Sequence, residues 1–136
     1  MNGLSGPIVV YGPSDNAETY DIDVGPVMLS DWFHDYYQNL LEDIFFATET
    51  CDPHCPPMSN NMLINGKNNY PCNTTSLPCT PNAGQAQFKF QTGKRHRLRL
   101  INSAAEAVIF FSIDGYELTV IVSWSLRLSA ALYGAD

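Results

Sequence analysis

Short apolar runs bounded by turn residues constrain the fold of this chain more than any other feature of its sequence. Asn65-Gly66 and Asp114-Gly115 follow such runs and are strong signals for tight turns between strands. Short strands at even spacing, with turns between them, predict an all-β chain folded as an antiparallel sandwich. Apolar and polar residues alternate, as in strands that bury one face, in "YDIDV" (20–24), "QFKF" (87–90), "HRLRL" (96–100) and "IFFSI" (109–113).

The first half of the chain adds two strands and one helix to this expectation. The run "GPIVVYGP" (6–13) lies between Gly-Pro pairs and predicts a buried strand, and another strand is expected from Val27. Four apolar residues at helical spacing predict one short helix near residues 38–48. Residues 51–60 and 71–85, rich in proline and cysteine, are expected to form loops.

Charge is distributed unevenly along the chain. Of 136 residues, the first 66 contain ten acids and no lysine or arginine, whereas the rest contain all seven bases and four acids. The net charge of -7 argues against nucleic acid as a partner, because a nucleic-acid binder presents a broad positive surface. No apolar run approaches the roughly 20 residues that span a membrane, so no membrane partner is expected.

Four cysteines lie within a loop-like stretch: Cys51, Cys55, Cys72 and Cys79. Two disulfides of undefined connectivity are favoured over a four-thiolate zinc site, because neither close pair has the short spacing typical of a zinc knuckle. Asn73-Thr74-Thr75 is an N-glycosylation motif directly beside Cys72. This combination favours an oxidising, secretory compartment, although the sequence after Met1 has no signal-peptide pattern.

The chain offers little catalytic machinery. Its three histidines, His34, His54 and His96, are far apart in the sequence and form none of the common metal-binding motifs. His34, between two acids and close to an aromatic residue, is interpreted as a packed, hydrogen-bonded histidine. No serine or cysteine lies in a recognisable nucleophile motif. No catalytic residue and no metal ligand is therefore assigned.

Five sequence blocks, in this order and spacing, together resemble the middle cupredoxin domain of fungal laccase-like multicopper oxidases. The resemblance covers residues 3–121 and implies a cupredoxin-like Greek-key β-sandwich over 1–121, followed by a divergent tail over 122–136. The blocks are "GLSGPIVVYGP" (3–13), "LSDWFHDYY" (29–37), "MLINGKNNY" (62–70), "GKRHRLRLINSAAE" (93–106) and "FSIDGYELTVI" (111–121).

The resemblance implies a parent enzyme that oxidises phenolic donors and reduces dioxygen to water with copper. Its partners would be the first and third cupredoxin domains, which supply the copper ligands in this family, and it would be extracellular. None of the ligand motifs occurs in this sequence, so no copper is expected on this chain and the isolated chain is expected to be inactive. Asp31 resembles the acid that borders the phenol pocket, where a carboxylate can accept the proton released on oxidation.

The match to the family ends at Ile121, which predicts a sandwich that is incomplete at the C-terminus. Alternation continues through the tail, so a further strand is physically possible there. An incomplete sandwich exposes a strand edge and an apolar face. The alternative function is a non-catalytic secreted β-sandwich that binds a partner or a glycan, for which exposed tyrosines such as Tyr36, Tyr37 and Tyr70 could serve.

Overall fold

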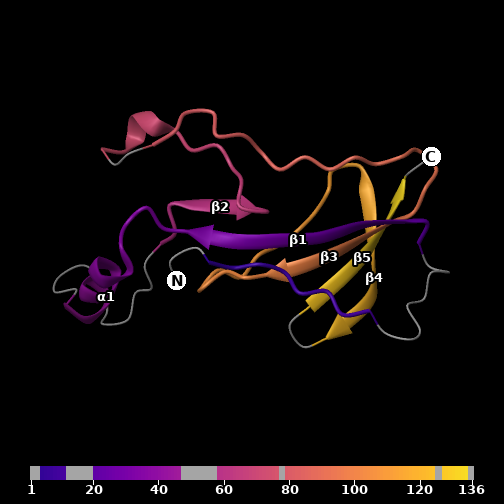
Figure 1. Cartoon of the computed structure of the whole chain (residues 1–136), viewed down its shortest axis with the longest axis horizontal. Coiled ribbons are helices and arrows are strands. Elements are labelled where there is room, and N and C mark those ends of the chain that lie inside the picture. Colours follow the sequence, from indigo (N-terminus) through magenta and orange to yellow (C-terminus); the bar gives the residue numbers. More distant parts are fainter. Residues whose placement is uncertain (1–3, 12–19, 47–57, 77–78, 125–126, 135–136) are drawn as a thin grey trace.

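A computed structural model describes residues 4–11, 20–46, 58–76, 79–124 and 127–134 (Figure 1). Five strands form a single sheet in the order β2-β1-β3-β5-β4, with one helix beyond the end of β1. The elements are β1 (Ile22–Trp32), α1 (Tyr37–Phe46), β2 (Asn61–Ile64), the 3-10 helix η2 (Cys72–Thr74), β3 (His96–Asn102), β4 (Tyr116–Trp124) and β5 (Arg127–Gly134). The predicted all-β class with one short helix is confirmed, and α1 coincides with the predicted helix over 38–46.

The sheet is mixed, whereas the turn pattern predicts an antiparallel one. β1 pairs with β2 antiparallel and with β3 parallel, and β5 pairs antiparallel with both β3 and β4. After β1 the chain makes a long excursion through α1, β2 and η2, and it returns beside the start of β1, where Ile22 aligns with His96. Because β3 therefore begins where β1 begins, the two strands run in the same direction.

β1 is one continuous strand, although the sequence predicts two. The pairing register with β3 shifts between Asp23 and Gly25, which marks a bulge. Gly25 has φ +93°, a conformation that a side chain disfavours, and its N–H donates to Asp23 Oδ1 at 2.9 Å. The Gly-Pro pair therefore bends the strand without ending it.

The predicted Asn65-Gly66 turn is confirmed. Both residues have positive φ, 50° and 72°, as a tight hairpin turn requires. The returning chain pairs only through the bridge between Ile64 and Lys67, so the hairpin has one full strand, β2. Asn65 also pairs with β1, because its N–H donates to Met28 O and its Oδ1 accepts from Met28 N, each at 2.8 Å.

Among the side chains that the structure describes, the core is small and lies on one face of the sheet. Val27, Leu29 and Leu98 are buried there. Two extended stretches, 86–91 and 107–113, cover them with inward side chains, of which Phe88, Phe90 and Phe111 are the largest. The strands predicted at 87–90 and 109–113 are wrong as paired strands, but their alternation is real, because every second side chain faces the core.

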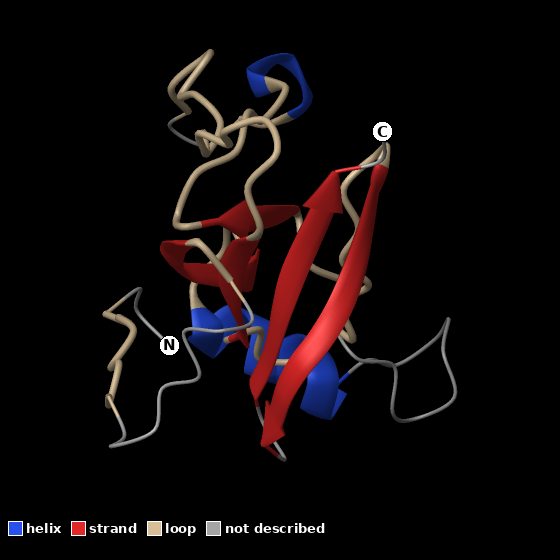
Figure 2. Ribbon diagram, turned by 90° about the vertical axis from the view of Figure 1, so that its right-hand side faces the viewer, coloured by secondary structure: helices blue, strands red, loops and turns tan. Residues whose placement is uncertain are grey.

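The two ends of the described chain also differ from expectation. The predicted buried strand at 6–13 is wrong for residues 6–11, which form no strand and leave Val10 82% exposed. Residues 12 and 13 lie outside the described ranges. By contrast, the residues after Ile121 complete β4 and form β5, which lies between β3 and β4 (Figure 1). The two long strands near the C-terminus lie side by side in opposite directions (Figure 2). No helix within the described ranges is long and apolar enough to cross a membrane.

Candidate functional site

The most highly constrained acid among the described residues is Asp31, near the end of β1. Val27, Leu29 and Asp31 follow one another on the inward face of the strand, so the alternation that buries the apolar pair also buries the carboxylate. Asp31 is only 9% exposed. A buried charge is costly unless it is hydrogen-bonded, so its partners determine whether the site is stable.

Those partners are backbone amides rather than a cationic side chain. Asp31 Oδ1 accepts from Ala105 N at 2.9 Å, and Oδ2 accepts from Ala105 N and Glu106 N, each at 3.1 Å. A longer contact of 3.4 Å joins Oδ2 to Ala107 N. Three successive N–H groups thus converge on one carboxylate, an arrangement known to bind anions.

The loop that presents these amides is held by its own side chains. Ser103 donates from both its backbone N and its hydroxyl to Leu29 O, at 2.8 and 3.1 Å. Asn102 spans the loop, since its Oδ1 accepts from Ala104 N at 2.9 Å and its Nδ2 donates to Ala107 O at 3.2 Å. Residues 102–107 therefore form a compact turn against the end of β1.

The remaining hydrogen-bonding capacity of Asp31 limits what it can do chemically. An ionised carboxylate has about four lone-pair sites. Oδ2 accepts three N–H groups, whereas Oδ1 accepts one, so these bonds leave one lone pair of Oδ1 unused. The carboxylate can therefore accept one more proton or hydrogen bond, through Oδ1.

The two described histidines are engaged in packing and hydrogen bonds. The His34 ring lies 4.2 Å from the Tyr70 ring, and its backbone N donates to Asn60 Oδ1 at 2.8 Å. His96 is 2% exposed, packs edge-on against Phe90, and its Nε2 accepts from Gln91 N at 3.1 Å. His54 lies outside the described residues. Within the described ranges, no group of three or more potential ligands converges, so the residues described here do not fit a copper site.

Two arginines of β3, and Arg95 just before it, are paired with residues at or just before the start of β1. Arg99 contacts both carboxylate oxygens of Asp23, at 2.5 and 2.6 Å, and Arg97 donates to Tyr20 Oη at 3.1 Å. Arg95 donates to Asp21 through its backbone N at 2.8 Å and its Nε at 3.5 Å. The backbone hydrogen bond, and then the guanidinium, hold the pKa of Asp21 below its ordinary value.

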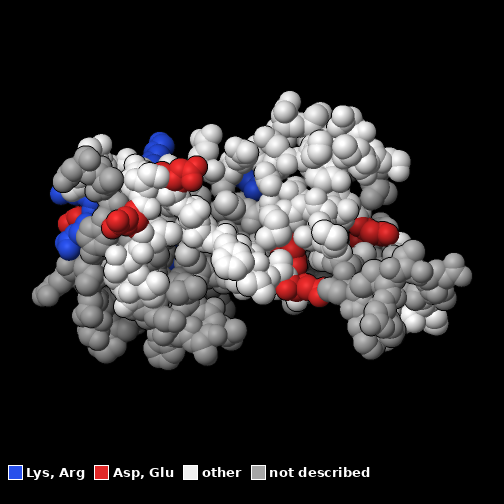
Figure 3. Space-filling view, turned by 180° about the vertical axis from the view of Figure 1, so that it is seen from behind, with Lys and Arg blue, Asp and Glu red and all other residues white. Residues whose placement is uncertain are grey.

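This pairing accounts for three of the seven bases in the second half of the chain. Lysine and arginine atoms gather toward one end of the molecule, with acidic atoms among them (Figure 3). A surface of alternating sign is typical of a solvated, self-paired face rather than a polyanion site.

One disulfide lies in the long loop after β2. Cys72 and Cys79 are bonded, with 5.6 Å between their Cα atoms, so these two sulfurs are not zinc thiolates. Cys51 and Cys55 lie outside the described residues. Asn73, in η2 beside the disulfide, is exposed to solvent.

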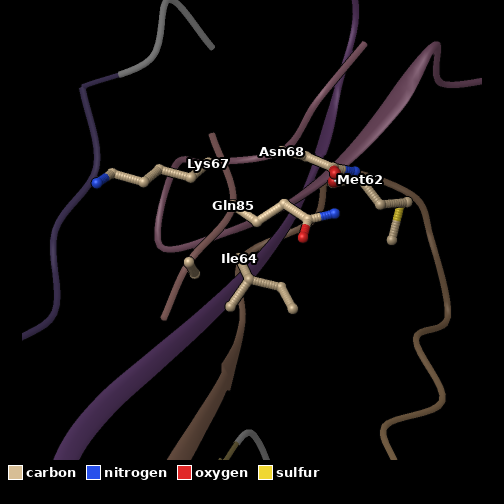
Figure 4. Close-up of a pocket in the computed structure, with 6 residues that line it drawn as sticks. Met62, Ile64, Lys67, Asn68 and Gln85 are labelled. Atoms are coloured by element: carbon tan, nitrogen blue, oxygen red, sulfur yellow. Dashed lines mark hydrogen bonds between the residues drawn. The ribbon is translucent and has the colours of Figure 1, made fainter. Parts of the chain in front are cut away.

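A hollow of about 370 Å³, which no sequence pattern predicts, lies beside the β2 hairpin (Figure 4). The Gln85 side chain points from the loop toward Met62 and Asn68, whereas Lys67 points away (Figure 4). The Asn65-Gly66 pair predicts the hairpin. No local sequence pattern predicts that the loop at Gln85 and Ala86, some twenty residues later, lies beside it. The lining residues are Met62, Ile64, Lys67, Asn68, Gln85 and Ala86.

Comparison with known proteins identifies the family. Residues 23–123 match the sequence profile of the multicopper oxidase family, which is most of the chain. The chain belongs to the multicopper oxidase family. Among curated relatives, a laccase from Cryphonectria parasitica is 41% identical over 125 residues, covering 90% of this chain and 18% of that protein. Dihydrogeodin oxidase from Aspergillus terreus is 34% identical over 122 residues, covering 88% of this chain and 19% of that protein.

Solved structures agree with the sequence comparison. A mutant of the laccase from B. aclada superposes with a TM-score of 0.71 at 27% identity, over 86% of this chain and 24% of that chain. The crystal structure of laccase from Botrytis aclada gives a TM-score of 0.61 at 28% identity, with the same coverage. The predicted laccase-like resemblance and the cupredoxin-like fold are therefore confirmed.

The multicopper oxidase segment spans about a fifth of the length of the curated relatives it matches. The family implies copper in the full-length protein, while the described part of this chain contains no converging ligand group. The open sheet, with its two extended cover segments, corresponds to part of a cupredoxin β-sandwich.

Proposed function

We propose that this chain serves as the middle cupredoxin domain of a laccase-like multicopper oxidase. The parent enzyme would oxidise phenolic donors and reduce dioxygen to water, and the first and third domains would contribute the copper ligands. The supporting observation is the family match over residues 23–123, in a chain whose relatives are about five times longer. On this proposal, residues 1–121 act as a scaffold between two copper-binding partners, and residues 122–136 are a divergent tail.

We further propose that Asp31 borders the phenol pocket of the assembled enzyme. Its carboxylate is oriented by the 105–107 amides, and these bonds leave one lone pair of Oδ1 unused. Oxidation of a phenol makes its proton strongly acidic, so a fixed carboxylate at the pocket edge is suited to accept it.

The parent protein is proposed to be secreted and glycosylated at Asn73. The Cys72–Cys79 disulfide favours an oxidising compartment, and the exposed Asn73 lies within an Asn-x-Thr motif. Expression in a eukaryotic secretory host should add a glycan that a glycosidase removes, and Asn73→Gln should abolish that mass. An unmodified Asn73 in such a host would contradict this part of the proposal.

The scaffold function is tested with two proteins. The pure chain, supplied with copper, should consume no oxygen with a phenolic dye. A Botrytis aclada laccase in which residues 22–121 replace the matching segment should bind copper and oxidise the same dye. Oxygen-dependent oxidation by the chain alone would contradict the proposal, and so would a copper-loaded, folded chimera without activity.

A further inference from the structure

We infer that the backbone amides of Ala105, Glu106 and Ala107 form a carboxylate-binding nest, which Asp31 occupies, and that Asp31 thereby positions the cover segment 107–113. This inference is independent of the proposed substrate contact, because it concerns what Asp31 binds within this chain. The ligand class of the nest is a carboxylate, and its resident ligand is a side chain.

The position of Asp31 explains why it needs such a partner. It is the third residue of the inward series Val27, Leu29 and Asp31, so β1 places it against the core instead of in solvent. An unpaired charge at that position would destabilise the fold. Successive amides supply hydrogen bonds to an anion without a second charged group, as in other backbone nests.

The nest has supports of its own. Ser103 is bonded twice to Leu29 O, and Asn102 spans the loop from Ala104 N to Ala107 O. Neither set of bonds involves the Asp31 side chain. If that side chain is removed, the turn should therefore keep its shape, and its amides should still converge on an empty site.

The nest also determines where the cover segment begins. Ala107 is both a partner of Asp31 and the first residue of the extended segment whose Ile109, Phe111 and Ile113 pack on the core. This segment does not pair with any strand of the sheet, so strand pairing does not hold its start in place. Asp31 accordingly acts as a positioning residue for the apolar cover.

The test uses the full chain with Asp31→Ala, and Glu106→Ala is the matched control, since it also removes one acid but keeps all three amides. Amide hydrogen exchange at residues 105–107 should be at least about tenfold faster in Asp31→Ala than in the parent chain. Added sodium formate should restore the protection with a saturable dependence, whereas chloride at equal ionic strength should not. Glu106→Ala should exchange as the parent chain does and should not respond to formate.

Unchanged exchange in Asp31→Ala would overturn the inference, and so would a loss of protection that formate does not restore. If Asp31→Ala fails to fold in chloride, folding on addition of formate supports the nest and failure in formate overturns it. Asp31→Asn keeps one acceptor oxygen, so its exchange should be intermediate between those of Asp31→Ala and the parent chain. No copper or phenol is present, so the outcome is separate from that of the proposed oxidase function.

Discussion

Polar side chains near the ends of strands provide hydrogen bonds that the pairing of the strands does not. Asp31 binds the amides of the turn after β3, and Asn65 pairs with both backbone groups of Met28. Asp21 accepts the backbone N–H of Arg95 just before β3 begins. In each case a short polar side chain binds backbone far away in sequence, so its loss should affect a segment rather than a single contact.

The lowered pKa of Asp21 predicts a pH-dependent contribution to stability. The folded chain holds this pKa below the unfolded value of about 3.9, because the Arg95 amide and guanidinium favour the ionised form. The contribution is complete above that value and is lost as the pH falls through the folded pKa. We therefore expect the parent chain to melt at a higher temperature than Asp21→Asn at pH 7, with a smaller gap at pH 3.

The measurement is thermal unfolding of both proteins across this pH range. The gap should be small, since the Asp21 side chain is 36% exposed and solvent screens the interaction. A gap that stayed constant from pH 7 to pH 2 would contradict the assignment of the effect to this carboxyl.

At the scale of elements, β1 organises the molecule. It pairs with β2 on one edge and with β3 on the other, and of the three apolar residues buried among the described side chains it carries two. Its bulge at Asp23 and Gly25 lets one strand pass through a Gly-Pro pair while the inward series continues to Asp31. The position of the candidate site therefore depends on the geometry of this bulge.

Gly25→Ala should destabilise the chain by about 1–2 kcal/mol, because φ +93° is strained for any residue with a side chain. The space around Gly25 is open, so a steric clash with other residues is not the cause. Gly6→Ala is the matched control, since that glycine is also in open space and has no positive φ. Urea unfolding should separate the two variants, and equal midpoints would show that the bulge tolerates a side chain.

For the molecule as a whole, the cover over the core determines which apolar side chains are exposed to solvent. The segment 107–113 turns Ile109, Phe111 and Ile113 inward and leaves Val108 and Phe110 outward, at 84% and 95% exposure. Exposed apolar side chains in one place mark a surface that binds a partner or aggregates. In the proposed parent enzyme, such surfaces would face neighbouring domains.

We expect the chain to bind a hydrophobic dye strongly and to be only marginally stable. Phe110→Ser should reduce dye fluorescence with little change in the unfolding midpoint, because Phe110 is almost fully exposed. Phe111→Ser, one residue later, should lower the free energy of unfolding by roughly 3 kcal/mol, since it leaves a cavity over the core. A sharp cooperative melt of the parent chain without dye binding would contradict the expectation of marginal stability.

Local sequence patterns were sufficient to predict several parts of this structure. Period-two alternation identified the inward residues of β3 and both cover segments, because a pleated chain must place every second side chain on the same face. Asn65-Gly66 predicted its turn, since few other pairs adopt positive φ twice in succession. Helical spacing located α1, and sequence blocks identified the family.

Tertiary structure alone decided which extended segments pair and what Asp31 binds. Alternation is the same in a paired strand and in an unpaired cover, so 107–113 and β3 could not be told apart by pattern. The parallel pairing of β1 with β3, and the place of β5 between β3 and β4, depend on where long connections return the chain. The partners of Asp31 are backbone amides some 74 residues away, and since every residue but proline carries such an amide, no sequence pattern marks them.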